Sequence, residues 1–365
     1  MLNPWRDVPA EILRNGFAPM HRPAGRSFQG IPSIACTAQG RIWAAWLSGG
    51  TKEPHIDNYA VLAYSDDGGK TWVDPALVID HPDSKRVRIN FITLWADESN
   101  KLWMCWGQAA GDWNLKENAY ISSFCVCMEN PDADHPIIGR PFFMFPAWTH
   151  SKPIRTSNGE WLFTTDHVFN PHAASIYAAK RLGETPVLRG TAHSRCPWKF
   201  CHAATLIERR DGSLWQLSRI EQGHYGGIEE SVSRDGGRIW SDFEMQLPDP
   251  LTGPGSRFHL SRLQSGAMLL LNHVSHHNSS PQAAFRRTSL AAFLSDDDGK
   301  TWTKPYIFDE RIDISYPDAC QMKDGRILII YDHNRKTDAE ILFLSLTEEE
   351  IRQGQPTSQI VSRRR

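Results

Sequence analysis

The sequence contains no long hydrophobic run. Residues 1–17 hold no apolar core of the kind that a signal peptide needs, and no later stretch approaches the length of a membrane-spanning helix. We therefore expect a cytoplasmic protein that has no membrane partner.

Neither sign of charge is in excess. The 365 residues carry 40 Lys and Arg against 42 Asp and Glu, which leaves a formal net charge of -2. Such a chain has no general attraction for nucleic acid, so we expect no nucleic-acid partner. A charged ligand must instead be held by local side chains.

Cysteine spacing offers no disulfide framework and no metal site. The seven cysteines are an odd number without paired spacing, and no second pair follows Cys125 and Cys127. A zinc site at His273, His276 and His277 is the weaker interpretation, because zinc also needs oriented partner groups that a sequence does not show. We therefore expect free thiols, no metal and no cofactor.

Helical periodicity is also scarce, since only residues 347–352 and 9–14 are compatible with a turn or two of helix. Instead, a turn followed by an apolar strand recurs six times, with its turn residue at positions 40, 100, 159, 212, 266 and 325. The intervals are 60, 59, 53, 54 and 59 residues. Asn-Gly and Asp-Gly turns of this kind begin β-hairpins. Six such units, each able to hold four strands, predict blades around a common axis.

A second motif supports blades. Residues 65–72 and 295–302 fit S-x-D-x-G-x-T-W, and residues 233–240 fit it with Ile239 in place of Thr. The motif resembles the Asp box of sialidases and other bacterial-neuraminidase-repeat propellers, where it forms the turn between the third and fourth strands of a blade. In such a turn Asp and Ser cap the backbone and Trp packs between sheets.

The predicted fold is therefore all-β: a six-bladed β-propeller of four-stranded antiparallel blades with Asp-box turns, forming a single domain over residues 1–365. We expect short N- and C-terminal extensions. The blades are expected at roughly 25–80, 81–140, 141–195, 196–250, 251–310 and 311–350.

Strand order predicts where a ligand binds. In an antiparallel blade the Gly-rich hairpin and the Asp box share one face of the disc, and the opposite face carries the start of each innermost strand and the loop after each second strand. Basic groups with aromatic neighbours on that opposite face suit an oligosaccharide that contains an acidic sugar. The candidate substrate-binding residues are Arg88, Lys152, Lys199, Arg219, Arg257, Arg287, His167, His273, Asp318 and Arg335.

The resemblance to sialidases covers about residues 25–350 and implies catalytic roles. Tyr316 matches the place of the nucleophilic Tyr, and Asp57 lies where the acid/base Asp is expected. Arg219 and Arg287 match two of three arginines that bind the substrate carboxylate. The candidates for the carboxylate that activates the Tyr are Glu221, Glu229 and Glu230, with Glu221 first. Further candidates for proton transfer are His202 and His259.

One departure from the sialidase pattern concerns the third arginine. The Arg-Ile-Pro motif that opens the first blade of sialidases reads Gly30-Ile31-Pro32 here. Arg26, Arg88 and Arg257 are candidates to replace the missing cation. Loss of a bidentate carboxylate partner is not conservative, and it favours an acidic sugar such as a uronate over sialic acid.

These features predict a carbohydrate-active enzyme that cleaves the glycosidic bond of a terminal acidic sugar, either a uronate or a sialic-acid-like sugar. Hydrolysis would use Asp57 and Tyr316 with a Glu. The alternative is β-elimination next to a uronate, as in some sialidase-like propellers that this chain resembles and that are known as rhamnosyl-glucuronate lyases. A third possibility, from another class, is a non-catalytic glycan-binding propeller.

Overall fold

The computed structural model describes residues 8–110, 121–166, 173–194, 200–221, 227–242, 250–274, 286–354 and 360–364, with the backbone alone at 200–202, 220, 221 and 360–364. The contacts between residues divide the chain into two compact units. The first unit comprises Met1–Trp148, Asp318–Ser345 and Gln359–Arg365. The second unit comprises Thr149–Pro317 and Leu346–Ser358.

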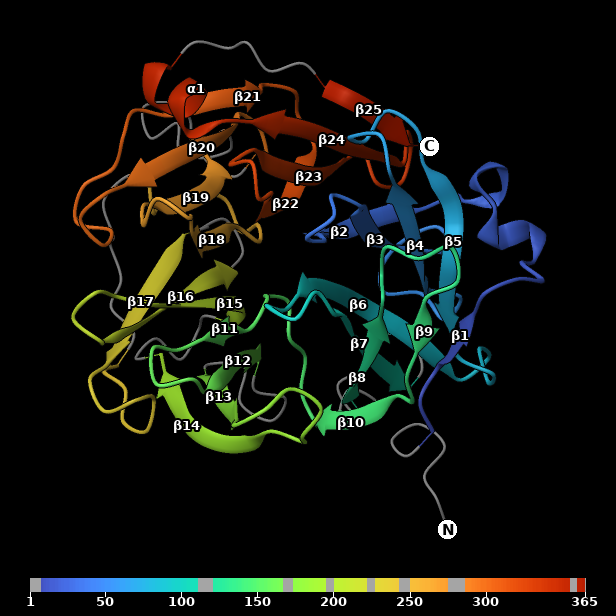
Figure 1. Ribbon diagram of the computed structural model, residues 1–365, viewed down its shortest axis with the longest axis horizontal. Coiled ribbons are helices and arrows are strands. Elements are labelled where there is room, and N and C mark those ends of the chain that lie inside the picture. The colour runs from blue at the N-terminus through green and yellow to red at the C-terminus, as the bar shows by residue number, and fades with distance from the viewer. Residues whose placement is uncertain are drawn as a thin grey trace. The chain divides into compact units, whose positions relative to one another are not determined.

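The described strands form six antiparallel sheets, one for each repeat of the sequence (Figure 1). Apart from the terminal strand β1, the strands of every sheet are consecutive in the chain. The predicted all-β fold of six antiparallel blades is confirmed.

Two sheets and most of a third lie in the first unit. The first sheet contains β2 (Gln29–Cys36), β3 (Ile42–Ser48), β4 (Tyr59–Ser65) and β5 (Val73–Asp80), with β1 (Glu11–Leu13) added beside β5. The second sheet contains β6 (Val87–Ala96), β7 (Leu102–Ala110), β8 (Ile121–Glu129) and β10 (Phe142–Phe145), with β9 (Ile137–Ile138) paired to β8. The sixth sheet contains β22 (Ile314–Gln321), β23 (Ile327–His333), β24 (Glu340–Leu346) and β25 (Ile360–Arg364).

Three sheets lie in the second unit. The third contains β11 (Ile154–Arg155), β12 (Trp161–Asp166), β13 (Ala173–Ala179) and β14 (Val187–His193). The fourth has three strands in its described part, β15 (Phe200–Glu208), β16 (Leu214–Glu221) and β17 (Ile228–Ser233). The fifth contains β18 (His259–Arg262), β19 (Met268–His273), β20 (Leu290–Ser295) and β21 (Tyr306–Asp309).

The terminal segments correct two expectations. Residues 9–14 are not helical, because Glu11–Leu13 pair with β5 as an extra strand. The last blade does not end at residue 350, because β25 pairs with β24 and covers the edge that β24 would otherwise expose. The other short helix was predicted correctly: α1 (Glu348–Gln353) begins where the side chain of Thr347 accepts a hydrogen bond from the backbone of Glu350.

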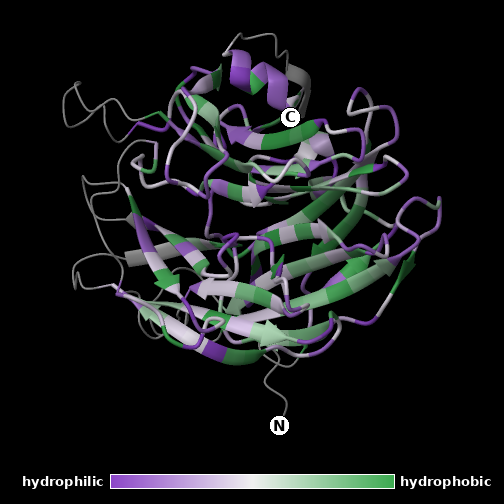
Figure 2. Ribbon diagram, turned by 60° about the vertical axis from the view of Figure 1, so that its left-hand side comes forward, coloured by the Kyte–Doolittle hydropathy of each residue, from purple (hydrophilic) through white to green (hydrophobic). Residues whose placement is uncertain are grey.

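Apolar strands pack sheet against sheet within each unit. Figure 2 shows mostly hydrophobic strands and mostly hydrophilic connections. In the first unit β2 contacts both β6 and β23, and Trp46 shares a core with Phe343. In the second unit β15 contacts β12 and β18, and Trp215 shares a core with Leu270.

The Asp box of the first sheet shows why its residues are needed. The Asp67 carboxylate accepts hydrogen bonds from Ser65 Oγ at 2.8 Å and from the backbone N–H of Thr71 at 2.8 Å. Gly69 has φ +88°, and a Cβ there would lie 2.3 Å from the ring of Phe343. The indole of Trp72 meets that same ring edge-on, with 5.7 Å between centroids.

Replacing Trp72 with Ala is expected to lower the free energy of unfolding by about 3 kcal/mol, because it opens a cavity between the first and sixth sheets. Denaturant unfolding followed by circular dichroism measures the change. The control is Val73→Ala, since Val73 is 46% exposed and its truncation is expected to cost no more than about 0.5 kcal/mol. Equal losses from both variants would contradict this role of Trp72.

Candidate active site

Tyr316 lies near the start of β22, where the backbone is strained. Its φ is 52°, in the left-handed region that residues other than glycine rarely adopt, and its side chain is buried. Strain of this kind persists only where the surroundings hold it, and it is common at functional sites.

Three arginines surround the Tyr316 ring. Nη1 of Arg219 on β16 donates a hydrogen bond to the phenolic oxygen at 2.7 Å. The guanidinium carbons of Arg287, Arg257 and Arg219 lie 5.0, 5.6 and 5.7 Å from the ring centroid. These distances are within the range of cation–π interactions. We call Tyr316, Arg219, Arg257 and Arg287 the arginine–tyrosine cluster; all four belong to the second unit.

Backbone carbonyl groups hold two of these arginines in place. Arg257 is buried just before β18; its Nη1 donates to His150 O at 3.0 Å and its Nη2 donates to Tyr316 O at 3.2 Å. Arg287 donates to Gly255 O at 2.8 Å. The guanidinium of Arg257 thus connects the backbone just before the third sheet with the backbone near the start of β22.

The cluster residues lie at the strand ends away from the Asp boxes. In the fourth sheet Leu214 is opposite Ser233, which begins the Asp box, whereas Arg219 is opposite Ile228 at the other end. In the fifth sheet the Asp box begins at Ser295, and Arg287 precedes the opposite end of β20. This is the side of each sheet on which strand order predicts ligand binding.

His150, whose backbone carbonyl contacts Arg257, pairs through its side chain with a carboxylate. His150 Nε2 is 3.3 Å from Asp166 Oδ2, and Asp166 Oδ1 accepts the backbone N–H of Ala203 at 2.9 Å. We call His150 and Asp166 the His–Asp pair. Sequence reasoning did not select His150 as a site residue. One signal was present, because an Asp-His dipeptide recurs at positions 166–167 and 332–333, in two of the repeats.

In the first unit, an arginine side chain fills the space beside Gly30. A Cβ at Gly30 would lie 2.7 Å from Cδ of Arg335, so Gly30 permits this close approach. The Arg335 guanidinium pairs with Asp332 at 3.0 Å and with Glu53 at 2.9 Å. Arg335 therefore lies where a side chain at position 30 would begin.

The three candidates for the missing arginine have different environments. Arg26 is buried in a two-bonded ion pair with Asp74, at 2.6 and 3.1 Å. Arg88 is fully buried and donates to Ala110 O at 3.1 Å. Arg257 is the candidate that the structure brings into contact with Tyr316.

Four other predicted site residues have contacts outside the cluster. Asp57 is exposed beside His55, with 3.4 Å between Nδ1 and Oδ2. Asp318 ties β22 to β2, since its Oδ2 accepts from Ser33 Oγ at 2.7 Å and from the backbone of Ile34 at 2.9 Å. These are the contacts of a structural residue. His259 bonds to Ser261 at 2.8 Å along its own strand, and Lys152 is half-buried two residues after His150.

Several of the predicted site residues are not among those that the structure describes. Lys199 and His167 fall outside the described residues, as do the side chains of His202 and Glu221. The backbone register nevertheless pairs His202 with Arg219 across β15 and β16.

The two glutamates of β17 have different surroundings. Glu229 is fully buried and lies 3.3 Å from Ser194 Oγ. Its neighbour Glu230 accepts a hydrogen bond from Trp215 Nε1 at 2.6 Å. Because successive strand residues point to opposite faces, the two carboxylates serve different surfaces.

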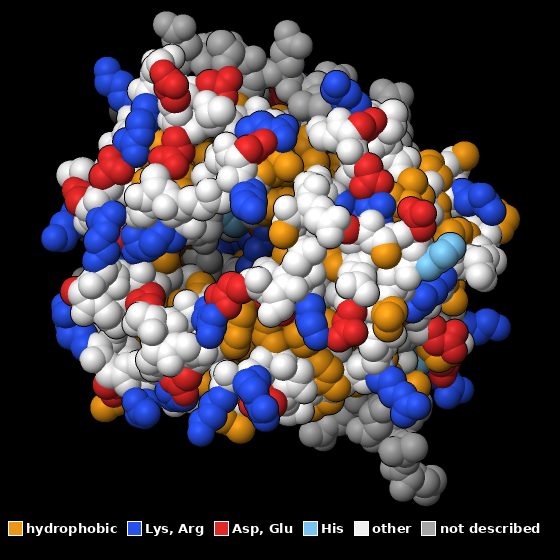
Figure 3. Space-filling view, in the orientation of Figure 1, with side chains coloured by type: hydrophobic (Ala, Val, Ile, Leu, Met, Phe, Trp, Pro, Cys, Tyr) orange, Lys and Arg blue, Asp and Glu red, His pale blue; other side chains and the backbone are white. Residues whose placement is uncertain are grey.

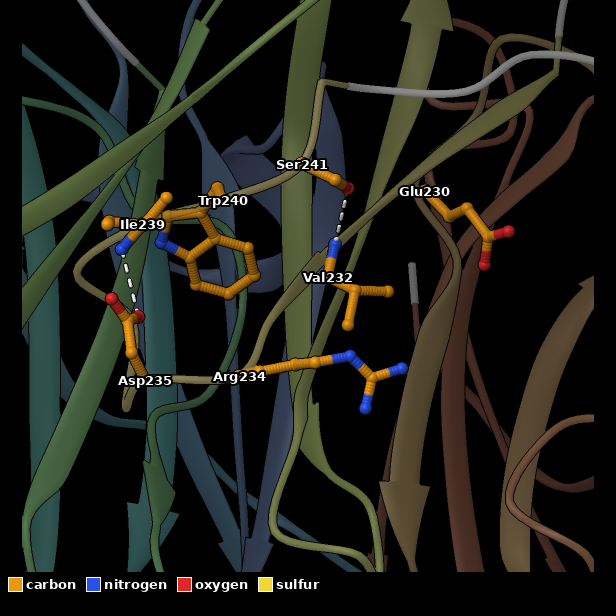
Figure 4. A pocket seen from close by; sticks show the side chains of 7 residues that line it. All are labelled: Glu230, Val232, Arg234, Asp235, Ile239, Trp240 and Ser241. Atoms are coloured by element: carbon orange, nitrogen blue, oxygen red, sulfur yellow. Dashed lines mark hydrogen bonds between the residues drawn. The ribbon is translucent and has the colours of Figure 1, made fainter.

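A surface pocket lies beside the Asp box of the fourth sheet. Figure 4 shows its lining residues, which are Glu230, Val232, Arg234, Asp235, Ile239, Trp240 and Ser241. The bonds drawn there run from the backbone of Ile239 to Asp235 and from the backbone of Val232 to Ser241. These polar groups stabilise the turn, so we assign no ligand to this pocket.

The described residues offer neither a metal site nor a membrane-spanning helix. No group of three or more His, Cys, Asp or Glu among these residues is placed to hold a metal ion, and no helix among them is both long and apolar enough to cross a bilayer. The five cysteines whose side chains are described are all free thiols. Figure 3 shows Lys and Arg interspersed with Asp and Glu over the face in view, consistent with the formal net charge of -2.

A family model described as "BNR repeat-like domain" matches residues 40–329, which is most of the chain. The chain belongs to this family. Comparison with curated proteins found no match. The repeats and Asp boxes of this family member explain the match, since they span the same region of the sequence.

Solved structures of sialidases have the same fold as this BNR repeat-like chain. A Hadza microbial sialidase, Hz136, is 18% identical with a TM-score of 0.69, covering 90% of this chain and 68% of its own. The K499G mutant of NanB sialidase from Streptococcus pneumoniae is 14% identical, with a TM-score of 0.67 over 94% and 71%. The intramolecular trans-sialidase from Ruminococcus gnavus, in complex with oseltamivir carboxylate, is 13% identical with a TM-score of 0.64 over 93% and 98%.

Replacing Ile239 with Thr is expected to lower the pKa of Asp235. Hydrogen bonds from the Thr71 and Thr301 side chains hold the pKa of Asp67 and Asp297 at about 2. The pKa of Asp235 is lowered first by the backbone of Ile239, which has no hydroxyl to add. Carboxyl titration by NMR measures the value. An unchanged Asp235 pKa in the variant would contradict this explanation.

His273 is expected to make the protein sensitive to acid. Burial lowers its pKa from 6.5 to about 4, while Nδ1 bonds to Thr288 O at 2.9 Å. Its imidazole is therefore neutral at pH 7, so it offers no cation to a substrate there. The unfolded chain binds the proton more readily, so stability is complete above pH 6.5 and falls as the pH drops toward 4, by about 2 kcal/mol between pH 7 and 5.

Denaturant unfolding at both pH values tests this expectation. His273→Gln should reduce the loss of stability between pH 7 and 5 relative to the unaltered protein. The matched control is His193→Gln, because His193 is exposed on β14 and its loss should leave the pH dependence unchanged. An identical pH dependence in all three proteins would exclude His273 as the cause.

Proposed function

We propose that this protein is an enzyme that cleaves the glycosidic bond of a terminal acidic sugar in an oligosaccharide, at the arginine–tyrosine cluster. The observation that carries the proposal is the convergence of Arg219, Arg257 and Arg287 on Tyr316. Binding sites with several cations around one hydroxyl suit a ligand that carries an anion beside a reacting centre.

The three arginines would bind the sugar carboxylate. Guanidinium groups match a carboxylate in charge and planar geometry, and they keep their charge at every physiological pH. Arg257, from the fifth repeat, would supply the third guanidinium, since position 30 of the first repeat is a glycine. The carboxylate would then lie against Tyr316, where all three guanidinium groups converge.

Tyr316 would react with the sugar. A guanidinium can only donate hydrogen bonds, so the phenolic oxygen is the acceptor in its contact with Arg219. A negative charge that develops on this oxygen is stabilised by the same contact. In hydrolysis, the phenolic oxygen attacks the anomeric carbon, and its proton passes to the leaving oxygen as the bond to the leaving sugar breaks. Water then cleaves the bond between the tyrosine and the sugar, which restores the phenol and releases the sugar.

Elimination is a second candidate reaction, and one observation favours it. It requires a base that removes a proton from the carbon beside the carboxylate. The imidazole of His150 pairs with Asp166, and Arg257 donates a hydrogen bond to the backbone carbonyl of His150. The sialidase fold of the structural neighbours supports a glycan substrate for either reaction.

Incubation with uronate-capped and sialylated oligosaccharides tests the proposed function. We expect cleavage, measured as new reducing ends; ultraviolet absorbance of an unsaturated uronate would accompany them only if the reaction is elimination. Tyr316→Phe should lower turnover at least about 100-fold, because it removes the reacting oxygen. Its free energy of unfolding should change by no more than about 1 kcal/mol, since one hydroxyl is lost.

The same substitution at a surface arginine provides the control. Arg257→Gln should weaken binding of the acidic oligosaccharide, measured by calorimetry, whereas Arg181→Gln should not, because Arg181 is exposed and pairs with Glu184 on the surface. Binding without any turnover by the unaltered protein would identify a glycan-binding module and overturn the proposed enzyme activity.

A further inference from the structure

We propose that Asn272 is a positioning residue of the arginine–tyrosine cluster. It holds the segment of residues 250–257, which carries Arg257 and also the carbonyl group that Arg287 binds. Through this segment Asn272 sets how strongly the site prefers a carboxylate to a neutral group. The inference rests on the proposed function, since it takes the same cluster as the place where the sugar carboxylate binds.

The segment 250–257, just before β18, needs hydrogen-bond donors from elsewhere in the protein. Pro250 and Pro254 have no N–H to offer. Within the segment, the backbone N–H of Ser256 donates to Pro254 O at 2.6 Å. Pro250, Gly253 and Pro254 are buried, so carbonyl groups of this segment must find their donors among protein side chains.

Asn272 supplies two of these hydrogen bonds. It is only 1% exposed, and its Nδ2 donates to Pro250 O at 2.9 Å and to Thr252 O at 3.4 Å. An amide nitrogen carries two N–H groups, so it can serve both carbonyl groups. Gly253 lies against the same amide, because a Cβ there would be 3.0 Å from Oδ1 of Asn272. The buried amide therefore fixes where this part of the segment runs.

Arg287 binds the other end of the segment. Its Nη2 donates to Gly255 O at 2.8 Å, and its guanidinium carbon lies 5.0 Å from the ring centroid of Tyr316. Arg257 comes two residues after Gly255 and donates to Tyr316 O at 3.2 Å. Two of the three cluster arginines thus depend on the position of Gly255, one through a hydrogen bond and the other through the chain.

The residue after Asn272 anchors the chain that carries Arg287. Nδ1 of His273 lies 2.9 Å from the carbonyl oxygen of Thr288, which directly follows Arg287. A carbonyl oxygen only accepts, so Nδ1 is the donor in this bond. Successive residues of a strand point to opposite faces of the sheet, which lets the end of β19 hold two segments at once.

These contacts connect three parts of the fifth repeat to one another. Asn272 joins β19 to the segment 250–257, Arg287 joins that segment to its own chain, and His273 joins this chain back to β19. Guanidinium groups that are held in this way lose less entropy when they bind a carboxylate. Because the Asn272 amide is directed at backbone carbonyl groups, it acts on a ligand through the arginines.

Calorimetry tests this role by comparing uronate-capped and sialylated oligosaccharides with the same compounds after reduction of the carboxyl group to an alcohol. The unaltered protein should bind the acidic form more tightly. Asn272→Ala should lower this preference by about 10-fold or more, because displaced arginines no longer match a carboxylate. A purely structural loss would weaken the binding of both forms equally and leave the preference unchanged.

The matched control is Asn100→Ala, in the turn between β6 and β7 of the first unit. The Asn100 amide also joins two parts of the chain, since its Nδ2 donates to Asp132 at 2.8 Å and its Oδ1 accepts the backbone N–H of Ala38 at 2.6 Å. This variant should lose stability without any change in the preference for the acidic form.

Gly253→Ala probes the same contact and carries the test if Asn272→Ala does not fold. Its added Cβ would lie 3.0 Å from Oδ1 of Asn272, so the segment must shift although every hydrogen-bonding group remains. We expect a loss of preference in this variant too. In the presence of Arg257→Gln, Asn272→Ala should have a smaller effect than it has alone, because part of that effect passes through Arg257.

Each contrary outcome has a distinct meaning. An unchanged preference in Asn272→Ala and Gly253→Ala, or an equal effect of Asn272→Ala with and without Arg257→Gln, would overturn the positioning role and leave the proposed function intact. If the unaltered protein showed no preference for any acidic form, both the proposed function and this inference would be overturned.

Discussion

A carboxylate at the end of a second strand holds the kinked first strand of the next sheet. Both the His–Asp pair and the ion pair of Arg335 with Asp332 depend on this contact. In the second unit Asp166 accepts the N–H of Ala203, and in the first unit Asp332 accepts the N–H of Ile31 at 2.8 Å. Ala203 and Ile31 both have left-handed backbone conformations, with φ of 50° and 56°. The carboxylate satisfies an N–H that the kink removes from the regular strand pairing.

The second oxygen of each carboxylate has a different partner. Asp166 faces the imidazole of His150, whereas Asp332 faces the guanidinium of Arg335. The same position of the repeat thus stabilises the fold with one oxygen and orients a basic side chain with the other. A basic group in this position is fixed by the architecture, which reduces the entropy lost when it meets a ligand.

Concentration of positive charge distinguishes the arginine–tyrosine cluster from the rest of the molecule. The chain as a whole carries a formal charge of -2, yet three guanidinium groups converge on a single phenol. Buried like charges oppose folding unless polar groups hold them, and here carbonyl oxygens do so. An anionic ligand would relieve this repulsion, which is why the cluster, and not the pocket beside the Asp box of the fourth sheet, is the candidate site.

The sequence by itself determined the six sheets, the Asp boxes and the strand ends where the candidate site lies. Those features follow from local spacing, because turn residues and alternating apolar residues act within a few positions of one another. It also singled out Tyr316, Arg219 and Arg287, since the family resemblance preserves their places in the repeat. Only the tertiary structure decided that Arg257 contacts Tyr316, that Asp318 ties two strands together, and that His150 pairs with Asp166. These contacts join residues from different repeats, and which residues meet depends on backbone kinks and side-chain packing that no local pattern records.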